Sequence, residues 1–142
     1  LNYSSKPCNK KRGFFIVMNN LFWLKFISLS GALAVMLGAF AAHSLDDSLS
    51  DTHMATFRTA VLYHFLHTLA LLAVICLPVS LVKPHFQSLI AVSFAAGILV
   101  FCGSLYALVL LDLPAMGMIT PVGGVAFILG WILLFFAARR PE

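Results

Sequence analysis

Four long stretches of the sequence contain no Asp, Glu, Lys or Arg and are rich in apolar side chains. A bilayer core about 30 Å thick is crossed by about 20 apolar residues in an α-helix, and each stretch is long enough to do so. The apolar residues are continuous rather than alternating with polar ones, which favours helices over the strands of a membrane barrel. The pattern therefore predicts an all-α integral membrane bundle of four transmembrane helices, at about residues 21–42, 58–81, 87–111 and 121–138.

Capping residues refine the ends of the second helix. Ser50 is followed by Asp51, which predicts an N-cap and an acid in the first turn, where the helix dipole favours negative charge. The helix is therefore expected to begin near Asp51 at the membrane surface and to enter lipid near Ala60. Pro78 falls in its last part, and we expect this proline to kink the helix.

Prolines also mark the later boundaries. Residues 83–85 contain Pro84 and are predicted to form a short turn before the third helix. Residues 112–114 are expected to end that helix. Thr120 followed by Pro121 predicts the start of the fourth helix, with the threonine as N-cap and the proline at the first helical position.

The composition agrees with a membrane protein and excludes a soluble domain. Of the 142 residues, 61% are hydrophobic and 10% are charged, whereas soluble domains carry roughly 25% charged residues. The net charge of +4 depends on a basic N-terminal segment, so it gives no reason to expect a nucleic-acid partner. The expected surroundings are the lipid bilayer, with a homo-oligomer or a second membrane protein as the partner to consider.

The first methionine is Met18, and the preceding residues include the basic run Lys10-Lys11-Arg12-Gly13. A purine-rich coding stretch at this position resembles a ribosome-binding site. We therefore expect residues 1–17 to be translated upstream sequence and residues 18–142 to form a single transmembrane domain. Two alternatives stay open: a genuine basic tail, and a secretory signal ending at Ala39-Phe40-Ala41.

Basic residues set the predicted orientation. Four of them from Met18 onward lie at one set of helix ends, and Arg58 alone lies at the other set. Because Lys and Arg are enriched in cytoplasmic segments, both termini are predicted to be inside. The four inner residues are Lys25, Lys83, Arg139 and Arg140.

Small residues repeat along the predicted helices. Helices in lipid gain much of their packing energy where small residues let backbones approach closely. The first helix carries four of them at intervals of four residues, and the third and fourth carry glycines. The predicted packing positions are Ser30, Ala34, Gly38, Ala42, Gly103, Gly123, Gly124 and Gly130. Two membrane cysteines, Cys76 and Cys102, are expected to be small buried apolar residues.

Polar side chains form the most informative pattern. With the predicted topology, all four helices bring hydrogen-bonding groups to one level near the outer side. His64 and His67 are three apart, so they are expected to share a helix face. The candidate polar cluster is His43, Tyr63, His64, His67, Ser104, Tyr106 and Thr120.

Several roles fit this cluster. Intramembrane ionisable residues are costly, which favours a proton relay, a metal site or a pocket for a polar headgroup. Hydrogen bonding between helices, typically about 0.6 kcal/mol per pair, is the simpler role. No carboxylate or thiolate lies at the same depth, so no metal and no cofactor is expected.

Particular strings in the sequence are also recognisable. They are residues 38–43 (GAFAAH), 59–64 (TAVLYH), 67–70 (HTLA), 103–106 (GSLY), 119–124 (ITPVGG) and 130–131 (GW). In this order and spacing the sequence resembles the YgdD-like family of small bacterial inner-membrane proteins, a domain of unknown function with family number 423. The resemblance covers about residues 21–138 and implies a multi-pass inner-membrane protein of four helices. It implies no activity, substrate or catalytic residue, and Ala41 and Ser44 replace two glycines of the family pattern.

Three functional hypotheses follow. The first is a non-enzymatic bundle that oligomerises or supports a membrane assembly. The second is a transporter-like protein, or one that binds a ligand or proton, with an outward-facing pocket of histidines and tyrosines. The third, an enzyme, is the weakest because no nucleophile, base and acid occur together. No helix interior carries Asp or Glu, which disfavours proton-coupled exporters that depend on such a carboxylate.

Overall fold

The computed structural model describes residues 10–43, 45 and 49–138, with side chains from Leu21 onward. All regular structure in these ranges is helical. Four helical segments, at residues 21–43, 51–76, 84–110 and 114–137, are long and apolar enough to cross a membrane. The prediction of an all-α fold with four helices able to span a membrane is thereby confirmed. Its elements are α1 (Lys10–His43), α2 (Asp51–Cys76), α3 (Pro84–Gly97), the π-helical η1 (Ile98–Cys102), α4 (Gly103–Leu110), the 3-10 helix η2 (Pro114–Met118) and α5 (Thr120–Ala137).

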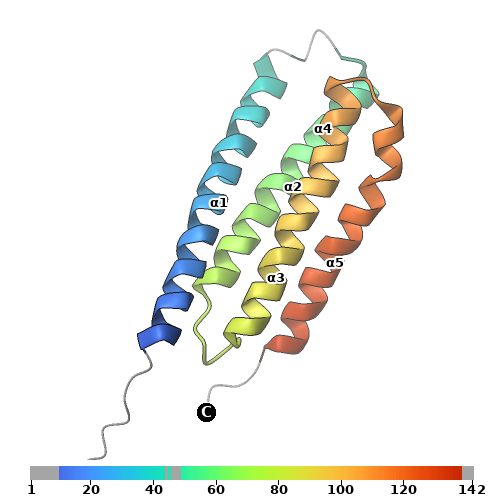
Figure 1. The fold of residues 1–142 in the computed structure, drawn as a ribbon. Helices are drawn as coiled ribbons and strands as arrows, with labels where there is room; N and C mark the ends of the chain where they lie inside the picture. The colour runs from blue at the N-terminus through green and yellow to red at the C-terminus, as the bar shows by residue number, and fades with distance from the viewer. Residues whose placement is uncertain (1–9, 44, 46–48, 139–142) are drawn as a thin grey trace, which may run out of the picture.

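The spans alternate in direction, and α3, η1 and α4 together make the third of them (Figure 1). At the upper end of the bundle in Figure 1, α1 and α4 end and α2 and α5 begin. Helix α2 is central, because α1 packs on it from one side and α3, η1 and α4 pack on it from another. Helix α5 packs against α3 and η1, so α1 and α5 form the two edges of the bundle.

Apolar side chains fill the interior in two clusters. The upper cluster is built around Phe57 of α2, which is completely buried, and includes Ala41, Met54 and Val109. The larger lower cluster includes Leu71 of α2. The polar side chains His64, His67 and Thr68 lie on α2 between the positions of Phe57 and Leu71, so a polar layer separates the two apolar regions. The lower cluster comprises Trp23, Ile27, Leu71, Val74, Val82, Ile90, Ala91, Phe94, Ala95, Ile98, Cys102, Phe127 and Ala137.

The predicted kink at Pro78 is wrong, because α2 ends at Cys76, before the proline. Leu77 is extended, with φ −65° and ψ 136°, as expected for a residue pressed by a following proline ring. The side-chain amide of Gln87 then donates to the carbonyl oxygens of Leu77 and Val74, at 2.7 and 3.3 Å. The bond to Leu77 gives a partner to a carbonyl beyond the last turn of the helix. The Val74 carbonyl also accepts from the Leu77 N–H at 3.2 Å. The predicted burial is confirmed for Cys102 but is wrong for Cys76, the last residue of α2, which is exposed.

Two further boundary predictions need correction. Residues 83–85 are not a turn, because Pro84 opens α3 with Lys83 at the N-cap, and proline suits the first helical turn. Thr120 does not cap α5, where Ile119 occupies the N-cap position. The Thr120 hydroxyl instead donates to the Met116 carbonyl oxygen at 3.3 Å.

The predicted packing row on α1 is only partly right. Ser30 and Ala34 are buried against α2 and Gly38 is half-buried, but Ala42 is exposed and Ala41 is buried in its place. The reason is the helical period of 3.6 residues: positions four apart drift around the helix axis. After three such intervals the drift is large enough that Ala41, and not Ala42, faces α2.

Glycine contacts hold α5 against the third span. A Cβ atom on Gly123 would lie 2.6 Å from the Phe101 Cα, and one on Gly130 would lie 2.5 Å from a ring carbon of Phe94. Gly97, which the sequence did not single out, is covered by the Phe127 ring in the same way. Gly124 makes only ordinary contacts, and a Cβ on Gly103 would meet nothing within 4 Å. The packing role predicted for Gly103 is therefore wrong.

This difference between glycines gives a direct stability test. Gly123→Ala should lower the free energy of unfolding by about 1–3 kcal/mol, because the added methyl group meets backbone that cannot move aside. Gly103→Ala, the matched control, should leave stability unchanged or slightly raised, since alanine favours helix. The unfolding midpoint of the detergent-solubilised protein measures both, and equal midpoints for the two variants would contradict the packing described here.

Candidate functional site

A connected set of hydrogen bonds links α1, α2 and α4, and we call it the Ser30 network. Ser30 Oγ lies 3.0 Å from His64 Nε2 and 2.7 Å from Thr68 Oγ1. His64 Nδ1 lies 3.2 Å from the hydroxyl of Tyr106. The Thr68 hydroxyl donates to the His64 carbonyl oxygen at 2.8 Å. Ser30, His64 and Thr68 are all buried, so four side chains satisfy one another inside the apolar bundle.

The donors of this network can be assigned in order. The single hydroxyl hydrogen of Thr68 goes to the His64 carbonyl, so Ser30 must donate to Thr68 Oγ1. The bond between Ser30 and His64 then takes its hydrogen from Nε2. His64 Nδ1 is left as an acceptor for the Tyr106 hydroxyl. For a neutral His64, this order uses every donor once and puts the imidazole hydrogen on Nε2.

His67 makes a second, separate arrangement. Its Nδ1 lies 2.9 Å from the Tyr63 carbonyl oxygen, which can only accept, so the hydrogen is on Nδ1. Its Nε2 accepts from the indole N–H of Trp131 on α5, at 3.4 Å. The ring stacks on Phe127, with centroids 3.6 Å apart and planes inclined by 18°. His67 therefore holds α5 against α2, and it is neutral in the opposite tautomer to His64.

The predicted shared site of the two histidines is therefore wrong. Positions three apart differ by roughly 60° around a helix, and this difference directs His64 toward α1 and α4 but His67 toward α5. His64 also lies near the midpoint of the 26-residue α2 rather than in its first turns. The polar layer thus lies in the middle of the bundle.

The other predicted cluster members are dispersed. Ser104 and Thr120 do pair, with their hydroxyl oxygens 2.8 Å apart, and they join α4 to α5 near the upper end. Tyr63 contributes its carbonyl to His67. The residue is 40% exposed, and its ring packs beside Phe101. His43 is exposed at the end of α1, away from the two networks.

Sequence reasoning missed three partners of the histidines. Ser30 was assigned to packing alone, and Thr68 and Trp131 were not assigned to the cluster. Thr68 lies four residues after His64 on the same helix, so helical spacing could have revealed it. Ser30 and Trp131 belong to other spans, and no spacing rule relates them to the histidines they bind.

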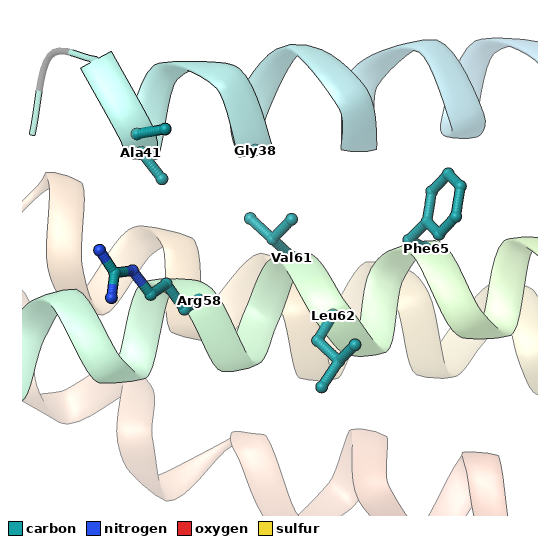
Figure 2. A pocket seen from close by; sticks show the side chains of 7 residues that line it. Gly38, Ala41, Arg58, Val61, Leu62 and Phe65 are labelled. Atoms are coloured by element: carbon teal, nitrogen blue, oxygen red, sulfur yellow. The ribbon is translucent and has the colours of Figure 1, made fainter.

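Two hollows open on α1. One, with a volume of about 200 Å³, lies between α1 and the third span, and Ser30, His64, Gly103 and Tyr106 contribute to its lining. The other, of about 320 Å³, lies between α1 and α2 and is lined by Gly38, Ala41, Ala42, Arg58, Val61, Leu62 and Phe65 (Figure 2). Among the residues whose positions are described, no three His, Cys, Asp or Glu side chains gather closely enough to hold a metal ion.

These features define a small multi-pass membrane protein whose buried polar groups join helices to one another. The chain belongs to the family described as protein of unknown function DUF423, which matches residues 37–124. It is similar to the UPF0382 membrane protein YwdK of Bacillus subtilis strain 168, at 40% identity over 80% of this chain and 92% of the relative. The UPF0382 inner membrane protein YgdD of Escherichia coli K12 is 37% identical over 87% of this chain and 93% of its own length. A UPF0382 membrane protein of Haemophilus influenzae is 40% identical over 84% and 95% of the two chains.

The family that the sequence resembled is thereby confirmed, and the chain is a multi-pass protein of the bacterial inner membrane. No solved structure is similar to it.

The two histidines should be distinguishable by nitrogen NMR. At neutral pH, ¹⁵N-labelled protein should show His64 protonated on Nε2 and His67 protonated on Nδ1, because their acceptors differ. Tyr106→Phe should alter the His64 signals alone. In His67→Asn the His67 signals should disappear, which assigns them. The same tautomer at both positions, or a doubly protonated His64 at pH 7, would contradict the assigned donor order.

Proposed function

We propose that this protein acts by association, as a non-enzymatic component that joins a second copy of itself or another protein in the inner membrane. The observation that carries the proposal is that both ring nitrogens of His64 and of His67 already take part in hydrogen bonds within the bundle. A general base or a metal ligand needs a ring nitrogen open to its substrate or ion. These histidines therefore favour a role in holding helices together.

The outer faces of α1 and α5 are the surfaces on which such association would occur. Only 17% of the most apolar part of the fourth span is buried inside the protein, against 44% for the third. Large side chains such as Phe135 and Phe136 point away from the bundle and are more than three-quarters exposed, at 76% and 78%. An edge helix with so much uncovered apolar surface can bind a neighbouring span without losing any contact within its own bundle.

One observation favours a second candidate function. The hollow beside the third span brings His64 and Tyr106 to a surface that faces lipid. A small ligand with an apolar body and a polar group could enter it and bind the free lone pairs of the Tyr106 oxygen. This would be the ligand-binding role expected from the sequence, but placed in the middle of the bundle and using one histidine.

The proposed orientation has both termini in the cytoplasm. Helix α1 begins and helix α5 ends at the lower end of the bundle (Figure 1). Lys83 is the N-cap of α3, which begins at that end, and Lys25 lies in the first half of α1. Asp51 and Arg58 lie in the first turns of α2, and Asp112 follows the end of α4, so these residues belong to the opposite end. Because basic residues favour the cytoplasmic side, the lower end is the inner one in this proposal.

Reporters fused after residue 142 test the orientation. A fluorescent protein that folds only in the cytoplasm should be bright, and alkaline phosphatase, which needs the periplasm, should be inactive. The same reporters inserted between α4 and α5 should give the reverse pattern. An active phosphatase at the C-terminus would overturn the orientation.

Association can be measured on the natively expressed protein, extracted in mild detergent and analysed by native mass spectrometry. We expect a complex larger than one chain, either a homo-oligomer or a stoichiometric complex with a second membrane protein. His67→Asn, which keeps a donor for the Tyr63 carbonyl but cannot titrate, should preserve that complex. A monomer without a stoichiometric partner would overturn the proposal.

Gly103→Leu separates the two candidate functions. Because nothing lies within 4 Å of a Cβ at Gly103, a leucine there should fill the hollow beside the third span while leaving the fold intact. Association should persist in this variant. If this variant keeps the complex but does not replace the wild-type protein in cells, the result would instead favour the ligand-binding candidate.

A further inference from the structure

The hollow between α1 and α2 has a consistent chemical character. Its α1 wall offers Gly38, Ala41 and Ala42, none of which projects more than a methyl group, and these small residues leave a volume of about 320 Å³. Apolar side chains of α2, namely Val61, Leu62 and Phe65, form the opposite wall. Figure 2 shows Arg58 at the end of the hollow nearest the end of α1. The hollow is thus an apolar slot with one cation at its mouth.

The position of Arg58 along α2 places its charge at the membrane surface. It is the last charged residue before the uncharged stretch of residues 59–82, and its side chain is exposed. Arginines at the ends of membrane spans extend their guanidinium groups to the level of the lipid headgroups. Arg58 already interacts within the protein, but a guanidinium has five N–H donors and can bind a phosphate as well.

We propose that this hollow binds one anionic phospholipid, with its phosphate on Arg58 and the first part of an acyl chain between α1 and α2. The positive charge of Arg58 is complementary to a negatively charged headgroup, and the apolar walls suit the acyl chain. The volume lies at the small end of the range for ligand pockets. A helix from another protein, about 10–12 Å across with its side chains, could cover a hollow of about 320 Å³ but would not fill it. This lipid site is independent of the proposed association.

The test uses the full chain purified in detergent and titrated with phosphatidylglycerol or phosphatidylcholine, with bound lipid counted by native mass spectrometry. The wild-type protein should retain one phosphatidylglycerol in preference to phosphatidylcholine. Arg58→Gln should weaken phosphatidylglycerol binding by about tenfold, the effect of losing one charged hydrogen bond. Lys83→Gln, which removes the same charge at the opposite end of the bundle, is the matched control and should bind like wild type.

A second variant keeps the proposal falsifiable if Arg58→Gln fails to fold. Ala42 is exposed and lines the hollow, so Ala42→Leu should fill the slot without disturbing the core. It should lose the retained lipid while keeping the wild-type unfolding midpoint. Three results would overturn the proposal: unchanged phosphatidylglycerol binding in a folded Arg58→Gln, equal loss in Lys83→Gln, or a wild-type dimer that Ala42→Leu converts to monomers. The last result would show that a second copy covers the hollow.

Discussion

The ordered hydrogen bonds from Tyr106 through His64 and Ser30 to Thr68 are the interaction on which the arrangement of three spans depends. Lipid offers no hydrogen-bonding partner, so a polar group inside the membrane must be satisfied by the protein. Each donor here serves one acceptor, and the last acceptor is a backbone carbonyl of α2. The network therefore closes on itself and leaves no buried charge. It also fixes α1 along α2, because sliding α1 would separate Ser30 from both partners.

Packing between the third and fourth spans follows a different principle. Aromatic residues at Phe94, Phe101 and Phe127 meet glycines on the facing helix, and no larger residue fits at those positions. Phe101 lies in the π-helical turn η1, and Ser104, which follows this turn, pairs with Thr120 at the start of α5. In lipid the contacts between close-packed surfaces replace the hydrophobic drive of soluble proteins. Close packing between glycines and aromatic residues therefore holds α5 along most of its length. Hydrogen bonds of Trp131 and Thr120 add to this packing.

These two modes of attachment explain why the protein has a rigid centre and apolar edges. Ser30, His64, His67 and Thr68 face inward and form hydrogen bonds inside the bundle. From Leu21 onward, the outward surfaces of α1 and α5 are mainly apolar, with Lys25 as a charged exception. Small residues near the end of α1 leave room beside Arg58. Lipid and neighbouring membrane proteins are therefore the molecules that this surface is suited to meet, and the proposed functions concern those contacts.

The sequence by itself determined the four spans and their approximate limits, because long, continuously apolar stretches cross the bilayer as helices, which satisfy their own backbone. The motif strings determined the family. It also identified His64, His67, Ser104, Tyr106 and Thr120 as members of a polar set. Tertiary structure decided how that set divides, because α1 and α4 lie opposite His64, whereas α5 lies opposite His67. Tertiary structure also decided that Ala41 rather than Ala42 is buried on α1. It showed that Gly97 packs against Phe127, and that Ser30 and Trp131 form hydrogen bonds with the histidines. Which helix stands opposite a given face depends on how all the spans pack together, and local spacing in one helix carries no information about that.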